Sequence, residues 1–373
     1  MLPLNSDSEL PNHKSVGILG AGQLGRMLAL AGYPLGLRPR FLDPSADACA
    51  GQLAEHIAAS YDDSAALERF AEGLDVVTYE FENVPVETAR LLAERVPVYP
   101  PPGALEVAQD RLAEKRFFRD QGIPTPPFLP VSTREELQKA LRTLGTPAVL
   151  KTRRFGYDGK GQVVIGSDRE ADAAWTALGG SPLILEGFVR FNRELSILAV
   201  RGLDGDMAFY PLVENHHSEG ILRLSISPAP TVTGEMQAGA EGYARRVMEA
   251  LSYVGVLAIE LFQVEGELLA NEMAPRVHNS GHWTIEGAET SQFENHLRAI
   301  LGLPLGSTAP RGYSAMLNII GDPPDTASVL RLPNSHLHLY GKAPRSGRKI
   351  GHITLRTDDP NAPAEGLQLL RGT

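Results

Sequence analysis

Short apolar runs alternate with amphipathic stretches through the first hundred residues. Strands are expected at 15–20, 38–43 and 75–81, and helices at 21–36, 47–57 and 84–96. Strands that alternate with helices indicate βαβ units and a parallel sheet. Three prolines at 100–102 mark the expected end of this domain, and residues 1–14 are expected to form a flexible tail.

The hydrophobic pattern of the remaining chain predicts a mixture of helices and strands. One continuous helix is expected after the prolines, to about residue 122, followed by a loop or extended connector at 123–132. A helix at 132–145 and a strand at 147–154 follow, and 183–264 alternates strands with one long helix near 234–254. After Pro310, strands are expected at 314–321, 336–342 and 349–355.

Two acids lie in the clearest strand pair of this pattern. The apolar runs Val256–Val264 and Leu268–Met273 flank a turn-like Glu-Gly-Glu, which predicts a β-hairpin. Glu260 and Glu272 are each six residues from Gly266, so they are expected to face each other. Facing like charges repel, and Mg²⁺ would relieve the repulsion while keeping nucleotide phosphates as its other ligands. The alternative is two solvated glutamates on an exposed face.

Composition narrows the class of protein. The net charge of -10 argues against a general nucleic-acid or anionic-membrane binder, and no apolar run reaches the length of a membrane span. The N-terminus lacks the features of a signal peptide. The single cysteine, Cys49, excludes an intramolecular disulfide and is expected to be buried. Together these features predict a cytoplasmic enzyme.

A glycine-rich turn follows the first strand. Gly20-Ala21-Gly22-Gln23-Leu24-Gly25 matches GxGxxG, and Asp43 ends the next strand, as in a dinucleotide-binding fingerprint. The same turn serves any phosphate or other anion at a helix N-terminus. The sequence downstream shows no hydride-transfer site.

A second glycine-rich segment follows Lys151, which ends an apolar strand. Gly156–Gln162 carries three glycines and Lys160, so its N–H groups are suited to phosphates, although a plain hairpin turn is the alternative. Glu186 and Glu194 interrupt apolar strands, either as edge charges or as contacts to an adenine amine or a ribose hydroxyl.

The stretch 271–283 is dense in polar side chains. Arg276, His278 and Asn279 lie just past Glu272, and such a set rarely offsets its desolvation by packing alone. We interpret it as an oxyanion-binding site. A zinc site at His278 and His282 is the alternative, but these residues lie in a Gly- and Pro-rich loop without the HExxH arrangement.

Nine motifs occur in an order that is typical of one enzyme family. They are GAGQLGRM, YEFENV, QDRLAEK, VLKTRRFGYDGKGQ, LEGFV, ENHHSEGIL, IELF, NEMAPRVHNSGHWT and LYGKAPRSGRKIGHI. This set, over residues 15–355, closely resembles the 5-(carboxyamino)imidazole ribonucleotide synthetases of the ATP-grasp superfamily, which act in purine synthesis. The resemblance implies an α/β and α+β chain with the ATP-grasp fold. Its parts would be a Rossmann-like pre-ATP-grasp domain (15–103), a split ATP-grasp region (104–310, lid about 123–188) and a β-rich C-terminal domain (311–373).

The resemblance also implies a role for each matching residue, with ATP and Mg²⁺ as cofactors. Glu260 and Glu272 correspond to the Mg²⁺ ligands. Nucleotide contacts would come from Arg111, Lys151, Gly156, Tyr157, Asp158, Gly159, Lys160, Gly161, Gln162, Glu186, Gly187, Phe188, Val189, Glu194, His217, Asn271 and Glu272. Bicarbonate and its phosphorylated form would meet Arg276, His278, Asn279 and Arg298, and the ribonucleotide would meet Gln23, Glu82, Tyr157, Asp158, Lys342 and Arg348.

The implied reaction joins bicarbonate to the exocyclic amine of 5-aminoimidazole ribonucleotide. ATP phosphorylates bicarbonate to carboxyphosphate, and the amine attacks carboxyphosphate or the CO₂ released from it. The proton is assigned to His278 or Asp158 as a hypothesis. One departure is Phe155, where many relatives carry an extra glycine, so a stiffer lid is expected.

Three other functions compete with this one. A formate-dependent glycinamide ribonucleotide transformylase would share the metal hairpin, but the stretch 276–282 and the tail 342–348 argue against it. An NAD-dependent oxidoreductase rests on the first glycine-rich turn, and a catalytically dead ATP-grasp domain is disfavoured by the intact Lys151, Glu260 and Glu272. A homodimer is expected from the resemblance, with no nucleic-acid or membrane partner.

Overall fold

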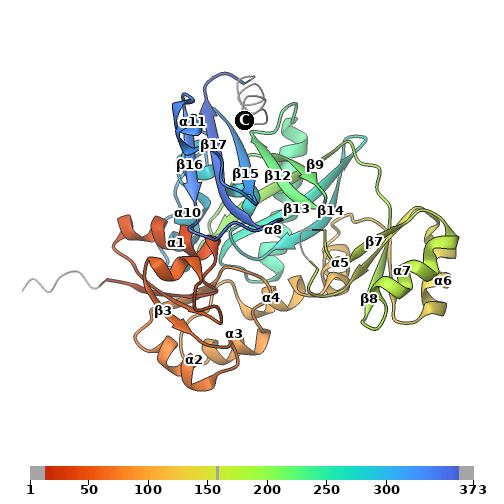
Figure 1. Cartoon of the computed structure of the whole chain (residues 1–373), viewed down its shortest axis with the longest axis horizontal. Coiled ribbons are helices and arrows are strands. Elements are labelled where there is room, and N and C mark those ends of the chain that lie inside the picture. Colours follow the sequence, from red (N-terminus) through yellow and green to blue (C-terminus); the bar gives the residue numbers. More distant parts are fainter. Residues whose placement is uncertain (1–12, 157–158, 361–373) are drawn as a thin grey trace, which may run out of the picture. The chain divides into compact units, whose positions relative to one another are not determined.

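The computed structural model describes residues 13–156 and 159–360. The chain divides after Tyr99 into two compact units, which are described one at a time (Figure 1). No helix in the described part of the chain is long and apolar enough to cross a membrane.

The first unit is a parallel sheet, as the alternating pattern predicts. Its strand order is β3-β2-β1-β4, where β1 is Ser15–Leu19, β2 is Arg38–Asp43, β3 is Glu55–Ala58 and β4 is Val76–Tyr79. Helices α1 (Gln23–Gly32), α2 (Ser64–Ala71) and α3 (Val86–Ala93) connect the strands. Strands β1 and β4 are almost fully buried, as expected for strands covered on both faces.

The helix predicted at 47–57 is wrong. A 3₁₀ turn, η2 (Cys49–Gln52), leads instead into the edge strand β3, which pairs with β2. Gly51 explains the change, because glycine disfavours a helix interior and a Cβ there would lie 2.8 Å from His56 Nδ1. Arg40 and Glu55 form an ion pair of 2.7 Å across the two strands. Cys49 is buried, as predicted.

The second unit is built on a large antiparallel sheet. Its described strands run in the order β14-β13-β9-β11-β12-β15-β17-β16, and β10 pairs with β9. Their bounds are β9 Arg193–Arg201, β10 Met207–Phe209, β11 Val213–Ser218, β12 Ile221–Ser227, β13 Gly255–Val264, β14 Glu267–Ala274, β15 Tyr313–Ile320, β16 Ser335–Leu339 and β17 Lys349–Thr357. The C-terminal strands therefore extend the same sheet that carries the two acids.

The two faces of this sheet differ in chemistry. Ile197 and Ile259 point to one face, where they pack against Val247 of helix α8 (Gly234–Ala250) in an apolar core. Ser196 and Glu260, the next residues along the same two strands, point to the opposite face. That second face carries the candidate site.

A smaller sheet has a hydrophobic core of its own. Its order is β5-β8-β6-β7, with β5 Phe128–Val131, β6 Ala148–Thr152, β7 Gln162–Ile165 and β8 Leu183–Gly187. Helices α6 (Arg134–Leu144) and α7 (Ala171–Leu178) cover it, and Leu137, Leu150 and Leu185 lie in its core. Strand β5 lies within the segment predicted as a loop or extended connector. We call 128–187 the lid subdomain.

The single helix predicted after the prolines is two helices, α4 (Pro102–Ala108) and α5 (Arg111–Asp120). Asp110 separates them, because its carboxylate accepts hydrogen bonds from the N–H groups of Leu112 and Ala113 and so caps α5. The remaining helices are α9 (Thr284–Gly287), α10 (Gln292–Ile300) and α11 (Thr326–Arg331), with the 3₁₀ turns η1 (Tyr33–Leu35), η3 (Asp168–Glu170) and η4 (Asn279–Gly281).

The turn of the β13–β14 hairpin gives a stability prediction. Glu265 has φ 50° and Gly266 φ 94°, so both central residues of the two-residue turn are left-handed, as in type I′. Asn is favoured at the first position of this turn, whereas Glu is strained there. Glu265→Asn is expected to raise the free energy of unfolding by about 0.5–1 kcal/mol, measured by urea denaturation. Gly266→Ala is the opposite control and should destabilise the protein by a similar or larger amount.

Candidate active site

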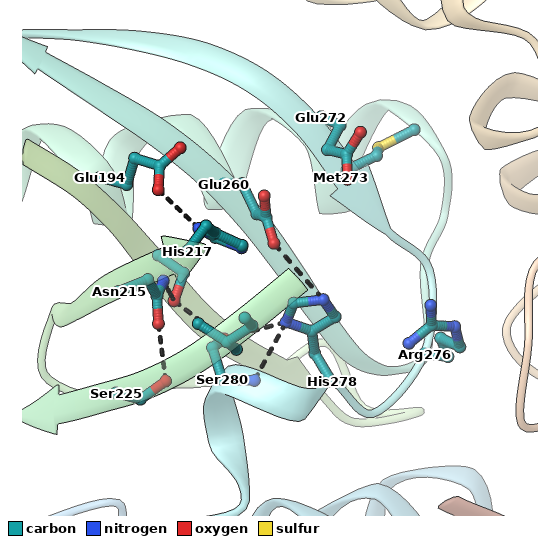
Figure 2. Close-up of polar contacts among 12 residues, drawn as sticks. Glu194, Asn215, His217, Ser225, Glu260, Glu272, Met273, Arg276, His278 and Ser280 are labelled. Atoms are coloured by element: carbon teal, nitrogen blue, oxygen red, sulfur yellow. Dashed lines mark hydrogen bonds and ion pairs between the residues drawn. The ribbon is translucent and has the colours of Figure 1, made fainter. Parts of the chain in front are cut away.

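The two acids of the hairpin lie directly opposite each other. Glu260 pairs with Glu272 in the register of β13 and β14, which confirms the predicted pairing (Figure 2). The turn, however, contains two residues rather than three, and a regular ladder from it would place Glu260 opposite Asn271. The register shifts between Glu260 and Leu261, which pairs with Ala270, so Asn271 is the extra residue of a β-bulge.

The bulge decides which face of the sheet receives Glu272. Before it, Leu268 and Ala270 point into the apolar core, and after it Met273 does so. A regular strand would have sent residue 272 into that core, because side chains alternate with a period of two. The extra residue therefore places both carboxylates on the polar face. Asn271 Oδ1 is buried there and has no hydrogen-bond partner within the described residues.

The surroundings of the pair shift the pKa values of the two carboxyl groups in opposite directions. Partial burial raises the pKa of Glu272, but Arg111 of α5 donates to it over 2.7 Å and the net shift is downward. Burial, and then the charge of Glu272, raise the pKa of Glu260 to about 7. Burial and Glu272 also raise the pKa of Glu114, which accepts a hydrogen bond from Met273 N over 2.6 Å. Glu272 is thus compensated by Arg111, whereas Glu260 is not and would gain more from a bound cation.

These donors fit a hard divalent cation. Two facing carboxylates and an unpartnered amide oxygen are the ligand types that Mg²⁺ prefers, with substrate phosphates completing the shell. The described residues contain no group of three or more His, Cys, Asp or Glu arranged to hold a metal.

A buried charge triad links the lid subdomain to helix α5. Glu186 of β8 lies 3.0 Å from Lys151 Nζ and 3.5 Å from Lys115 Nζ, and all three residues are buried. Burial raises the pKa of Glu186, but the two lysines outweigh it and hold that pKa near 2. Burial lowers the pKa of Lys115. Glu186 is thus ionised, and it holds Lys151 in one position.

Removing the acid of this triad should destabilise the lid. Glu186→Gln leaves two buried ammonium groups without a counter-charge, and breaking a buried pair costs about 3–5 kcal/mol. We expect a loss of about 3 kcal/mol at pH 7 in urea unfolding followed by the fluorescence of Trp175, which packs against the lid core. Glu135→Gln, an exposed acid of α6, is the matched control and should leave the urea midpoint unchanged within experimental error. Equal stability of the two variants would contradict the prediction.

The glycine-rich loop between β6 and β7 approaches the same region. Its base is closed by a hydrogen bond from Thr152 N to Gly161 O, and a Cβ on Gly156 would lie 3.3 Å from Arg111 Nη2. Gly159 and Gly161 have positive φ, as does the exposed Phe155 at φ 62°. Phe155 therefore adopts a conformation typical of glycine. Lys160 and Gln162 are exposed, whereas Tyr157 and Asp158 lie outside the described residues.

Histidines join the acids on the polar face. His217 Nδ1 lies 2.5 Å from Glu194 Oε2, and His278 Nε2 lies 3.6 Å from Glu260 Oε1 (Figure 2). The sequence placed Glu194, His217 and His278 at a nucleotide and anion site, and the structure brings them to one face with Glu260. Both side-chain polar atoms of Asn279 are buried and have no hydrogen-bond partner within the described residues.

The other predicted contacts are positioned as follows. Arg276 donates to Val277 O over 3.0 Å, and Arg298 of α10 forms an ion pair of 2.5 Å with Glu294. Gly187 ends strand β8, Phe188 and Val189 follow it, and all three are partly or fully exposed. His282, the second histidine of the zinc alternative, is fully buried beside His352, at a ring-centre distance of 4.8 Å.

The predicted ribonucleotide contacts fall in both units. Gln23 begins α1 and Glu82 follows β4 in the first unit, whereas Lys342 and Arg348 lie between β16 and β17 in the second. Arg348 Nη1 donates to Ala343 O over 3.2 Å, within the same loop. Their joint role therefore stays a prediction.

The first glycine-rich turn is filled by the protein itself. Glu80 accepts hydrogen bonds from Gly22 N and, over 2.7 Å, from Gly25 N, while Asp43 accepts from Ala21 N over 2.9 Å. A pyrophosphate or another anion at this helix N-terminus would meet the Glu80 carboxylate. The geometry thus argues against both the dinucleotide and the anion-site interpretations of the GxGxxG match.

Several residues that build the site were missed at the sequence level. Glu114 and Lys115 lie one helical turn from Arg111, and this spacing places them on the same side of α5. The sequence did not indicate that both side chains are buried. Glu80 gave no signal, because its partners lie 55 and 58 residues away along the chain.

Comparison with known families agrees with the fold. Residues 13–109 match the ribonucleotide synthetase preATP-grasp domain, residues 116–293 match the ATP-grasp domain, and residues 314–365 match the phosphoribosylaminoimidazole carboxylase C-terminal domain. The predicted fold class is confirmed: this is an ATP-grasp protein with a pre-ATP-grasp domain and a further C-terminal domain.

Individual relatives cover nearly the whole chain. The N5-carboxyaminoimidazole ribonucleotide synthase of Pseudomonas aeruginosa is 56% identical over 92% of this chain and 95% of its own. The crystal structure of the Thermus thermophilus synthetase superposes with a TM-score of 0.92 at 66% identity, covering 95% of this chain and 97% of the other. The Aspergillus clavatus enzyme in complex with ADP and 5-aminoimidazole ribonucleotide gives 0.90 at 34% identity, covering 97% and 98%. The chain belongs to the N5-carboxyaminoimidazole ribonucleotide synthase family.

Proposed function

We propose that this protein is an ATP-dependent ligase that carboxylates the exocyclic amine of 5-aminoimidazole ribonucleotide. The observation that carries the proposal is the facing pair Glu260 and Glu272, beside Arg111 and within the family's fold. The substrates are ATP, bicarbonate and the ribonucleotide, and the products are ADP, phosphate and 5-(carboxyamino)imidazole ribonucleotide. The reaction belongs to purine synthesis.

Mg²⁺ is the proposed metal, held by Glu260 and Glu272 with Asn271 alongside. When bound, it would neutralise charge on the β- and γ-phosphate oxygens. Lys151, fixed by Glu186, presents a cation to the nucleotide, and Arg111, which donates to Glu272, lies close to the loop at Gly156. Lys160 and the loop N–H groups are proposed to cover the phosphates.

The intermediate is proposed to be carboxyphosphate, because bicarbonate is a poor electrophile until phosphorylated. Asn279 has buried donor and acceptor atoms without a described partner, which is what an oxyanion subsite should offer. Arg276 and Arg298 are proposed to balance the negative charge, and a closed lid would protect the labile intermediate from water. Gln23, Glu82, Tyr157, Asp158, Lys342 and Arg348 are proposed to bind the ribonucleotide.

The deciding experiment is ADP release with Mg²⁺ and ATP under four conditions. The ribonucleotide is present or absent, and the buffer contains bicarbonate or is depleted of it. We expect rapid ADP release only with both. ADP release that does not depend on the ribonucleotide would contradict the proposal. So would ADP release that formate supports in the absence of bicarbonate. A cytoplasmic location and a homodimer also stay predictions, and sedimentation of the pure protein tests the second.

A further inference from the structure

A buried chain of hydrogen bonds runs from the large sheet to His278. Ser225 Oγ donates to Asn215 Oδ1 over 2.7 Å, Asn215 Nδ2 donates to Ser196 Oγ over 3.0 Å, and Ser196 Oγ lies 2.9 Å from Ser280 Oγ. Ser280 Oγ lies 2.9 Å from His278 Nδ1. The four residues that lead to His278 in this chain, Ser225, Asn215, Ser196 and Ser280, are at most 3% exposed. Figure 2 shows the chain ending at the imidazole beside Glu260.

The backbone fixes the direction of the last bond. Ser280 N lies 3.3 Å from His278 Nδ1, and a backbone N–H can only donate. His278 Nδ1 must therefore carry a lone pair, so the hydroxyl of Ser280 also donates to it. Because that hydrogen is used, Ser280 Oγ accepts from Ser196, and Ser196 Oγ in turn accepts from the amide of Asn215. Every donor in the chain points toward His278.

A neutral imidazole with a lone pair on Nδ1 carries its hydrogen on Nε2. Nε2 is the nitrogen that lies 3.6 Å from Glu260 Oε1. The nitrogen on the side of the acids is a donor.

We propose that this chain makes His278 a hydrogen-bond donor to an oxyanion, rather than a base at its Nε2 nitrogen, with Ser280, Ser196 and Asn215 as positioning residues. The oxyanion class is bicarbonate or its phosphorylated form, and this part rests on the proposed function. An Nε2–H nitrogen has no lone pair with which to take the proton of the attacking amine.

The tautomer is measured directly by ¹⁵N NMR of histidine-labelled, ligand-free full-length protein above pH 8. His278→Asn identifies the signals of this ring by their disappearance. We expect one pyridine-like nitrogen at Nδ1 and one pyrrole-like nitrogen at Nε2. The reverse pattern, or an even mixture of the two tautomers, would overturn the proposal.

Two substitutions test the chain itself. Ser280→Ala removes one donated bond, which should raise the ratio of the Nδ1–H to the Nε2–H tautomer about fivefold. Asn215→Asp keeps the side-chain shape but replaces the donor by an acceptor, so Ser196 turns its hydroxyl toward residue 215 and Ser280 turns toward Ser196. The ratio should then rise more than in Ser280→Ala. A purely structural role predicts no such order.

The matched control is Ser227→Ala on the same strand as Ser225. Ser227 is fully buried and its hydroxyl has no described partner, so its removal should leave the tautomer unchanged. If the charge of Asn215→Asp prevents folding, Ser196→Ala interrupts the chain at its centre and should raise the ratio by about twofold or more. A ratio that is unchanged in Ser280→Ala and Ser196→Ala would overturn the proposal.

Kinetics then separate this inference from the proposed function. In Ser280→Ala we expect the KM for bicarbonate to rise about fivefold while the KM for ATP stays within twofold, because the lost alignment concerns the anion subsite. Equal changes in both constants would overturn the donor role. If no ribonucleotide-dependent turnover exists, the proposed function fails, but the NMR result still decides whether the chain sets the tautomer.

Discussion

Glu272→Gln is expected to lower kcat for ADP release by about a thousandfold at a fixed, moderate Mg²⁺ concentration. The carboxylate is one of two that face each other across the hairpin, and its partner Glu260 cannot hold a hard cation alone as tightly. A metal ion supplies several kcal/mol of transition-state stabilisation in phosphoryl transfer, and each 1.4 kcal/mol is a factor of ten. Raising the Mg²⁺ concentration should restore part of the lost rate.

Glu267→Gln is the matched control for this experiment. Glu267 lies on the same hairpin, is exposed and pairs with Val264 next to the turn, so its kcat should stay within about twofold. Circular dichroism would check the fold of both variants. A Glu272→Gln protein that turns over at the normal rate and with the normal Mg²⁺ dependence would contradict the metal assignment.

The second large effect is the stability that three buried histidines lose in mild acid. His282, His296 and His352 are fully buried, and burial lowers the pKa of each, to about 3 for His296. Below about pH 6.5 these histidines bind protons in the unfolded chain but stay neutral in the folded protein, so they contribute less stability as the pH falls. Three such groups should remove about 4 kcal/mol of the free energy of unfolding between pH 7 and 5.5, whereas Glu260 and Glu114, whose pKa values are raised in the folded protein, add stability over the same range and offset part of that loss.

Urea unfolding at these two pH values measures the loss. A Trp175→Phe background leaves Trp283 as the only tryptophan, and Trp283 is fully buried next to His282 in the chain. His296→Gln keeps an acceptor for Val256 N, which donates to His296 Nδ1 over 3.1 Å, and should reduce the loss between pH 7 and 5.5 by about 1.3 kcal/mol, the contribution of one histidine. A loss equal to that of the unsubstituted protein would show that His296 does not contribute.

The hairpin shows how much the sequence could predict. The two apolar runs and the glycine between them were sufficient for the strands, and the pairing of Glu260 with Glu272 is as predicted. The turn is one residue shorter than predicted, and the bulge adds one residue to β14, so the two differences cancel and the predicted pairing results. Turn length and bulges depend on local backbone conformation, such as the positive φ of Glu265, and the hydrophobic pattern does not report it.

Contacts between distant segments set the limit of prediction elsewhere. Glu80 fills the glycine-rich turn, and Lys115 lies unexposed against Glu186, 71 residues further along the chain. In both cases the residue type indicated a surface position. Hydrogen bonds from two backbone N–H groups stabilise the buried Glu80, and the ion pair with Glu186 stabilises the buried Lys115. The serines that orient His278 were missed for the same reason, since Ser196 and Ser280 are 84 residues apart.

The bulge at Asn271 also limits how this hairpin can change over evolutionary time. The apolar pattern is in one phase before residue 271 and in the opposite phase after it. Deleting that residue would restore an uninterrupted ladder, yet it would either turn Glu272 into the core or carry Met273 out of it. Lineages should therefore keep the number of residues between the two glutamates, so a fixed spacing of twelve positions is the inherited feature of the site.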